Sequence, residues 1–183
     1  MKYLKLFILL LPFQFINAQQ ENAFSIGAAV SANLLFEQYN FNSHYEILPP
    51  PDIYIHAGYK FNSGFNVVLS AGYILLADNW NGTDLGIAIK SQAGERFYTI
   101  FGINYTSASG GEGEGNQATV YYKKNFFSGN FGAGYLVTKN AFVELNYILP
   151  LSSDKVYGFN HSADEILKLN GRLKISFGWN FYL

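Results

Sequence analysis

The chain has 183 residues, of which 49% are hydrophobic and 18% are aromatic, whereas only 14% are charged. Soluble proteins carry about 25% charged residues, so this composition indicates that a medium other than water faces much of the surface. The formal net charge of −1 offers no basic field that would attract nucleic acid. The absence of cysteine excludes disulfides, thiolate metal sites, a thiol nucleophile and a lipoprotein anchor.

The first 18 residues have the order of a secretory signal peptide. Lys2 and Lys5 precede the apolar run 6–11, and the segment ends in the small residue Ala18. We therefore expect cleavage after Ala18 and one mature domain over residues 19–183. A retained membrane anchor is the alternative, but Pro12 interrupts the apolar stretch. No later apolar run approaches the ~20 residues that a spanning helix needs, so a membrane would have to be crossed by strands.

Apolar residues alternate with small or polar residues along most of the mature chain, which is the two-residue period of a β-strand. Phe24, Ile26 and Val30 share one face of the first such segment, whereas Ser31 and Asn33 share the other. The alternation predicts strands at 24–36, 53–61, 65–75, 85–90, 97–105, 118–137, 143–149 and 173–183. We interpret 118–137 as one long, bulged strand, with two separate strands as the alternative.

The connections between these strands alternate in length. Short connections lie near Ser63, Gly94 and Lys139. Long connections are predicted at 37–51, 78–83, 108–117 and 150–170. Short turns at one end and long loops at the other are typical of outer-membrane barrels, and lipid excludes open sheet edges. The predicted fold class is therefore all-β, an eight-stranded antiparallel up-and-down transmembrane β-barrel.

The composition of the two faces favours lipid outside the barrel. A soluble lipocalin-like carrier would place Lys and Glu outside and apolar side chains around a ligand. Here the second face consists of Gly, Ser, Asn and a few charges, which suits a narrow lumen. Aromatic residues gather near the strand ends, as in interfacial girdles. They are Phe24, Phe36, Tyr59, Phe61, Phe65, Phe97, Tyr105, Tyr135, Tyr147 and Phe181. A two-sheet sandwich and a soluble lipocalin-like binding protein remain alternatives.

Two segments resemble the small OmpA/OmpX-type barrels of bacterial outer membranes. Residues 131–140, followed by Glu144 and Tyr147, are similar to the penultimate hairpin of that family. The last strand, with an apolar or aromatic residue at every second position from Leu173 to Leu183, resembles the terminal signal of outer-membrane proteins. The resemblance implies a monomeric barrel in the bacterial outer membrane, inserted by the assembly machinery of that compartment. The family usually ends in Phe, so Leu183 departs from the assembly signal.

The charges on the inward face are the candidate site residues, because an eight-stranded barrel is just wide enough to be filled by side chains. By position, Lys60, Lys90 and Glu144 fall toward the short turns. Toward the long loops lie Glu37, Asp84, Arg172 and Lys174. An unpaired buried charge is costly, so we predict two ionic layers. Glu144 would be held by Lys60 or Lys90, and Arg172 or Lys174 would pair with Asp84 or Glu37. A structural plug is preferred over a gated ion path.

The long connections hold most of the acidic residues, among them Asp52, Asp78, Glu112 and Asp154. Such carboxylates are normally solvated, and the alternative is that they share divalent cations with lipopolysaccharide phosphates. The glycine-rich run 110–115 lacks a following Lys-Ser/Thr pair, so it is interpreted as a flexible loop tip rather than a phosphate loop.

Catalytic and metal-binding signatures are weak in this sequence. His161 beside Ser162, with Asp164 or Glu165 as the orienting acid, is the best candidate for a lipid A-modifying enzyme. The His-x-Ser-Asn pattern of the deacylases is absent, and His44, His56 and His161 are too scattered for a metal site. We therefore expect no enzyme activity, no metal and no cofactor. The expected role is structural or interactive: membrane integrity, adhesion, or binding through the outer loops.

Overall fold

The computed structural model describes residues 24–39, 42–62, 64–74, 81–112, 120–151 and 167–183, so the signal-peptide prediction lies outside the described residues. The elements are β1 (Phe24–Tyr39), β2 (Asn42–Asn62), β3 (Phe65–Ile74), β4 (Asn81–Gln92), β5 (Phe97–Glu112), β6 (Val120–Leu136), β7 (Ala141–Pro150) and β8 (Leu167–Tyr182). Within these ranges no helix is long and apolar enough to cross a membrane.

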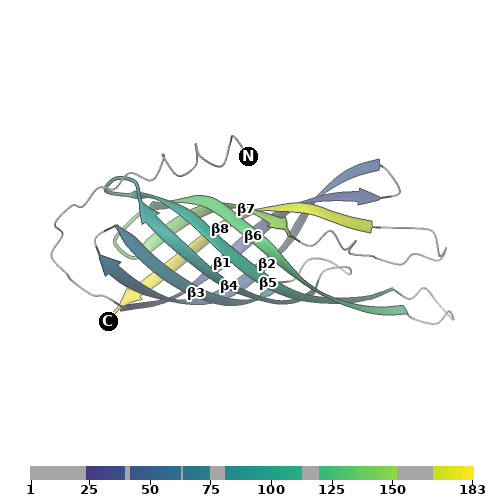
Figure 1. The fold of residues 1–183 in the computed structure, drawn as a ribbon, viewed down its shortest axis with the longest axis horizontal. Coiled ribbons are helices and arrows are strands. Elements are labelled where there is room, and N and C mark those ends of the chain that lie inside the picture. The colour runs from purple at the N-terminus through teal and green to yellow at the C-terminus, as the bar shows by residue number, and fades with distance from the viewer. Residues whose placement is uncertain (1–23, 40–41, 63, 75–80, 113–119, 152–166) are drawn as a thin grey trace.

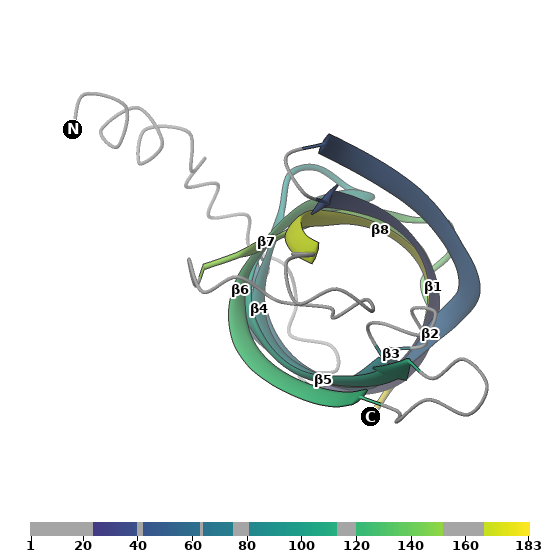
Figure 2. The same ribbon diagram turned by 90° about the vertical axis from the view of Figure 1, so that its right-hand side faces the viewer.

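The eight strands form a closed antiparallel barrel in sequence order, which confirms the predicted fold class (Figure 1). Each strand pairs with its neighbour in the chain, and β1 pairs with β8 from Ser25 opposite Tyr182 onward. The view along the axis shows the resulting ring (Figure 2). Closure gives every strand two neighbours, so the ring itself has no open edge. The two-sheet sandwich is therefore excluded.

Most connections at one end of the barrel are longer than those at the other, but parts of the predicted long loops are strands in the structure. The connection expected at 37–51 is mostly strand, because β1 and β2 pair as far as Tyr39 opposite Asn42. Likewise, β5 and β6 pair as far as Glu112 opposite Val120, so part of the predicted glycine-rich loop tip lies in a strand. We call this end the loop end, and the opposite end, with the β2–β3, β4–β5 and β6–β7 turns, the short-turn end. In Figure 1 the loop end lies to the right.

A proline run explains one irregularity in the sheet. The register between β1 and β2 shifts between Ser31 and Asn33, which pair with Asp52 and Leu48 respectively. The segment 49–51 of β2, which lies between these partners, is three consecutive prolines. Proline has no backbone N–H to donate to a ladder, so it is confined to strand edges and bulges. The bulge therefore occurs where the sequence cannot sustain regular pairing.

The sixth strand is one element, as expected, but it is not bulged. β6 pairs with β5 from Phe97 opposite Tyr135 to Glu112 opposite Val120 without a register shift. Its pairing with β7 is also regular, from Ser128 opposite Pro150 to Leu136 opposite Phe142. Gly129 lies on the outer face of β6, where the ring of Phe131 is beside it. The Ser-Gly-Asn segment therefore continues the strand and does not interrupt it.

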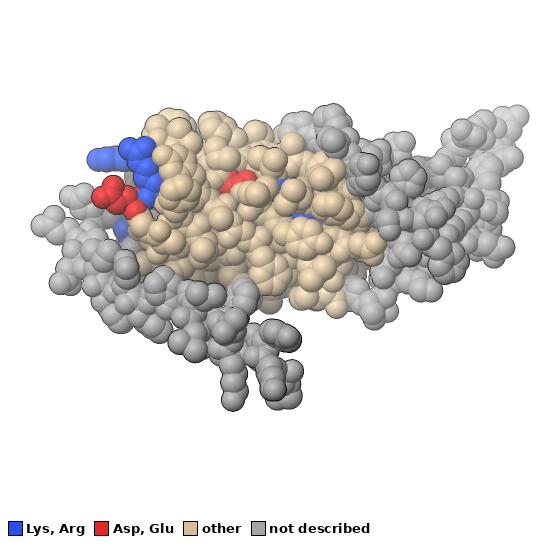
Figure 3. Space-filling model, turned by 90° about the horizontal axis from the view of Figure 1, so that it is seen from above, with Lys and Arg blue, Asp and Glu red and all other residues tan. Residues whose placement is uncertain are grey.

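The outward face is apolar and exposed, and the inward face is polar and buried. Ile55 is 65% exposed and Leu69 is 56% exposed, whereas Ser31 and Asn33 are each 2% exposed. The side of the barrel in Figure 3 is almost entirely uncharged, and most visible charges gather at the short-turn end. A soluble carrier would have the reverse arrangement, so the lipocalin-like alternative does not fit the structure.

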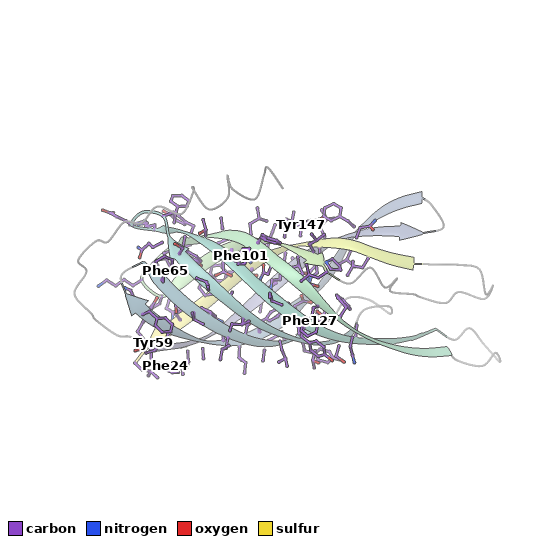
Figure 4. All side chains as sticks on the ribbon, viewed as in Figure 1. Phe24, Tyr59, Phe65, Phe101, Phe127 and Tyr147 are labelled. Atoms are coloured by element: carbon purple, nitrogen blue, oxygen red, sulfur yellow. The ribbon has the colours of Figure 1, made fainter. Side chains whose placement is uncertain are left out.

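Aromatic side chains form a belt near each end of the apolar surface. Figure 4 shows Phe24, Tyr59 and Phe65 near the short-turn end, and Phe127 and Tyr147 nearer the loop end. Ring contacts join Tyr59 to Phe61 and Phe97 to Tyr135 near the short turns, and Tyr105 to Phe127 and Phe36 to Tyr147 near the loop end. Such rings suit the boundary between hydrocarbon and headgroups, so the belts mark the membrane-facing band.

We expect Ile87→Lys to lower the free energy of unfolding in lipid vesicles by about 2–4 kcal/mol, because it places a charge in the middle of the lipid-facing band. Ile87 is 52% exposed on the outer face of β4, between Leu69 and Ile103 of the neighbouring strands. Denaturant titration measures the loss. The control is Ser91→Lys, which lies on the same face of β4 near its short-turn end and should cost about 0–1 kcal/mol. Equal effects of the two changes would contradict the assignment of this face to lipid.

Candidate functional site

All six charged residues proposed from the sequence face the lumen. Asp84, Glu144, Arg172 and Lys174 are buried. Lys60 and Lys90 are partly buried, nearer the short-turn end. The alternating pattern of the strands is responsible, because every second residue must point inward. Charged residues that lie away from the strand ends therefore face the lumen and not the lipid.

Arg172 of β8 lies between two buried carboxylates from other strands. Its Nη2 is 3.4 Å from Asp84 Oδ2, and its Nη1 is 3.7 Å from Asp52 Oδ2. Asp84 also accepts hydrogen bonds at 2.8 Å from Asn104 Nδ2 and Thr106 Oγ1. Buried charges are tolerated when they are paired and their remaining lone pairs are satisfied. We call Asp52, Asp84 and Arg172 the arginine layer.

Tyr54 ties the arginine layer to the neighbouring lysine. Its hydroxyl lies 3.2 Å from Oδ2 of both Asp52 and Asp84, so this group is placed to donate to either carboxylate. Lys174 Nζ lies 4.1 Å from the centre of the Tyr54 ring, a cation–π contact. Asn33 Nδ2 donates to Asp52 at 2.8 Å. The layer is therefore a network that links β1, β2, β4, β5 and β8 across the lumen.

A second ionic layer lies closer to the short turns. Lys90 Nζ forms an ion pair with Glu144 Oε1, and Tyr98 donates its hydroxyl to the same oxygen at 2.7 Å. The ammonium of Lys90 also lies 4.9 Å from the centre of the Phe142 ring. We call Lys90, Glu144 and Tyr98 the glutamate layer. The sequence left open whether Lys60 or Lys90 would hold Glu144, and the structure pairs Glu144 with Lys90.

Three inward aromatic rings each lie on a glycine of the next strand. Tyr54 is opposite Gly72, Tyr98 is opposite Gly134, and Phe142 is opposite Gly178. A β-carbon built on any of these glycines would overlap the facing ring. The glycines therefore provide the space in which bulky rings lie flat against the barrel wall. Because Tyr54 and Tyr98 also hydrogen-bond the buried carboxylates, these glycines support both ionic layers.

On the loop-end side of the arginine layer, the lumen is filled by apolar side chains. Leu35, Ile74, Ala108, Phe126 and Leu169 form one buried cluster that draws on five strands. We call this cluster the apolar layer. The space left between it and Arg172 is a cavity of about 10 Å³, which is about the space of one water molecule. The alternation in the sequence predicts apolar side chains on the outer face and does not predict this layer.

Sequence reasoning misplaced one member of the arginine layer. The sequence predicts that Asp52 lies in a solvated loop, but its side chain is 0% exposed in the lumen. The signal was present, because Asp52 shares the parity of Tyr54, His56 and Lys60 on the inward face of β2. The predicted long loop at 37–51 concealed it. Glu37, the other proposed partner, lies in β1, and its side chain is outside the described part of the structure.

Among the histidine and catalytic candidates, only the side chain of His56 lies within the described part of the structure. His56 faces the lumen, and its Nε2 lies 2.6 Å from Asn180 Oδ1. The group His161, Ser162, Asp164 and Glu165 lies outside the described residues. Among the side chains that the structure describes, no group of three or more His, Asp or Glu is arranged to hold a metal ion.

Comparison with known proteins identifies the class of this fold. No family model matches the chain, and no curated protein matches it. Solved structures match over most of its length. The N-terminal β-barrel domain of Pseudomonas aeruginosa OprF aligns at 14% identity and a TM-score of 0.50, covering 88% of this chain and all of that one. Ail, the attachment invasion locus protein of Yersinia pestis, in complex with the heparin analogue sucrose octasulfate, aligns at 11% identity and a TM-score of 0.51 with the same coverage.

These similarities, together with the closed eight-stranded ring, show that the chain has the fold of the small outer-membrane β-barrels. The resemblance to OmpA/OmpX-type barrels is therefore confirmed for the fold. Function is not carried over at such low identity, since one fold hosts many functions.

We expect Arg172→Met to lower the free energy of unfolding by about 3–5 kcal/mol, because it leaves two buried carboxylates without their cation. Denaturant titration in lipid vesicles measures this loss. Lys60→Met is the matched control, because no described carboxylate forms an ion pair with Lys60 and its removal should change stability little. A loss for Arg172→Met no larger than that for Lys60→Met would show that the arginine layer does not stabilise the barrel.

We expect Gly72→Ala to destabilise the barrel by about 1–3 kcal/mol, because the added methyl group displaces the Tyr54 ring and disturbs its hydrogen bonds. The same change in a Tyr54→Leu background should cost less, since the displaced ring is absent. A double-mutant cycle measures this coupling. Additive effects would indicate that Gly72 and Tyr54 act independently.

Proposed function

We propose that the protein is an outer-membrane barrel with a closed lumen, whose role is structural or lies in surface contacts made at the loop end. The single observation that carries this proposal is the combination of a lipid-facing outer surface with an interior filled by the apolar layer and the two ionic layers. A barrel of this width is filled when its inward side chains are large, whereas a channel needs a continuous water path.

The charge balance of the lumen supports a structural role for the ions. Asp52 and Asp84 are offset by Arg172 and Lys174, and Glu144 is offset by Lys90. Opposite charges in contact, with further hydrogen bonds, hold each other in place within the arginine layer and the glutamate layer. The apolar layer adds a barrier that hydrated ions do not cross readily, because dewetted constrictions block conduction.

The loop end is the proposed interaction surface. The β5–β6 hairpin continues from Gly110 to Glu112 beyond the last β4 partner, Asn81 opposite Ser109. The β1–β2 hairpin also continues beyond the point where β3 stops pairing with β2, at Ile53 opposite Tyr73. Both hairpins project from the ring in Figure 1. Paired strands that extend beyond the ring suit contact with a partner at the cell surface.

The proposed partners follow from the outer surface and the assembly route. The apolar band would contact outer-membrane lipids, and acidic residues at the loop end would meet lipopolysaccharide through shared divalent cations. Insertion would require the outer-membrane assembly machinery, and the barrel would act as a monomer. We propose no catalytic activity. Lipid A extracted from cells with and without the protein should therefore give the same mass spectrum, and a difference that His161→Ala abolishes would establish the enzyme alternative.

Gel mobility of the outer-membrane fraction with and without boiling tests the membrane assignment. A closed barrel resists detergent until it is heated, so we expect a compact unboiled band in that fraction. A protease-accessible tag inserted at 113–119 should be cleaved in intact cells if the loop end faces outside. Recovery of the protein from the soluble periplasm without a heat-dependent shift would overturn the proposal.

We expect no steady conductance from the wild-type protein in planar bilayers, because the filled lumen offers no water path. Glu144→Gln should leave this unchanged, since the apolar layer remains intact. The double variant Ile74→Ser with Phe126→Ala should admit ions, because it removes bulk and apolar character from that layer. A steady wild-type conductance that Glu144→Gln alters would replace the closed lumen with a gated ion path.

A further inference from the structure

The short-turn end of the lumen contains a cavity that the proposed function does not use. Its volume is about 600 Å³, within the range of small-molecule sites. Its lining comes from the short-turn ends of the strands and from the β2–β3 and β6–β7 turns. The lining residues are Ser25, His56, Lys60, Gly64, Phe65, Asn66, Val68, Lys90, Gln92, Phe97, Tyr98, Leu136, Lys139, Asn140, Asn180 and Tyr182. The glutamate layer lies at its inner end, because Lys90 and Tyr98 belong to both.

The charges around this cavity have one sign. Lys60, Lys90 and Lys139 line it, whereas no lining residue is a carboxylate. Lys90 is paired with Glu144, but none of the ion pairs among the described side chains involves Lys60. The deeper ionic layers are balanced, so Lys60 leaves the described lumen with an excess of positive charge. A cleft with low-dielectric walls focuses such a charge and concentrates counter-ions.

Two of these lysines flank one asparagine in a single row across the sheet. Lys60 of β2 is directly opposite Asn66 of β3, which is directly opposite Lys90 of β4. Neighbouring strands are about 4.8 Å apart, so the backbones of the two lysines are separated by about 10 Å. That spacing lets two flexible ammonium groups approach one anion from opposite sides. We call this arrangement the Lys–Asn–Lys row.

The asparagine in the row has unused hydrogen-bonding capacity. Asn66 Oδ1 is buried and has no hydrogen-bond partner among the described residues. The side-chain amide lies over Gly58, where a β-carbon would approach both of its polar atoms closely. A half-turn of the amide exchanges its oxygen and nitrogen, so this side chain can offer either an acceptor or a donor. An unsatisfied buried polar group in a cavity needs an explanation, and a ligand supplies one.

We propose that the Lys–Asn–Lys row is a binding site for a small phosphate-bearing anion that enters from the short-turn end. Lysine binds phosphate as a point charge, and two ammonium groups suit the several charged oxygens of a phosphate. The ligand oxygens would contact Lys60 and Lys90, with the Asn66 amide donating between them. The proposed function places the short-turn end in the periplasm. Only this orientation of the site rests on the proposed function.

The test uses the full mature barrel, isotopically labelled and refolded in a detergent without phosphate groups, at low ionic strength. Inorganic phosphate is titrated while backbone amide chemical shifts are recorded. We expect saturable shifts centred on Lys60, Asn66 and Lys90. Lys60→Gln should weaken the apparent affinity about tenfold. The matched control Arg96→Gln removes a positive charge from an exposed turn at the same end, outside the cavity lining, and should change the affinity less than twofold.

A second arm distinguishes a free ligand from a lipid headgroup. The barrel is placed in nanodiscs of zwitterionic or anionic phospholipid without added phosphate. Shifts at the same three residues that appear only with anionic lipid assign the site to a headgroup, whereas shifts that require added phosphate assign it to a soluble anion. Both results support a phosphate site.

Absence of saturable shifts in both arms would overturn the inference, as would equal weakening by Lys60→Gln and Arg96→Gln. Each sample is also run on a gel with and without boiling. Loss of phosphate binding with the heat-dependent shift retained counts only against the anion site. Loss of the heat-dependent shift in the wild-type protein counts against the barrel in the membrane, which separates the two failures.

Discussion

The backbone of this protein must satisfy its own hydrogen bonds, because a hydrocarbon environment supplies no water to pair with an exposed N–H or C=O. The ring meets this constraint through continuous pairing from β1 to β8 and back. Everything else in the structure follows from that closure. Antiparallel strands alternate their side chains, so one face must meet lipid and the other must fill a narrow interior. The two irregular segments of β2 are the proline run 49–51, beyond the part of β2 that pairs with β3, and the register shift between Lys60 and Asn62 beside the β2–β3 turn.

The buried charges of the filled interior form specific ion pairs and hydrogen bonds. Charged side chains inside a low-dielectric wall are costly unless they are paired, and each ionic layer supplies both the counter-ion and additional donors. Arg172 holds two carboxylates, and Glu144 accepts from both Lys90 and Tyr98. Glycines opposite Tyr54 and Tyr98 provide the space for the rings that carry those donors. Glycine on one strand is therefore required by the large ring on the neighbouring strand.

The two ends of the lumen have opposite character, and this asymmetry underlies both proposals. The loop end is closed by the apolar layer, and two hairpins extend beyond it. The short-turn end opens into a cavity with an excess of lysine. A lumen that is closed at one end and open at the other acts as a pocket rather than a channel. The same barrel can therefore anchor a surface for contacts on one side and hold a small anion on the other.

The sequence by itself determined the number of strands and, within the segments predicted as strands, the two faces and the charges that enter the lumen, because alternation is a local property that can be read along a single strand. It did not determine which charges meet. Whether Glu144 pairs with Lys60 or Lys90 depends on the register between strands that are distant in the chain, and on how the closed ring brings opposite walls together. The same reason explains the missed roles of Asp52 and the apolar layer. The inward parity of Asp52 is readable once β2 is known to continue that far, whereas Leu35 and Phe126 have inward parity within strands that the sequence already predicts. Their burial, however, exists only because several strands place side chains at the same height of one closed lumen.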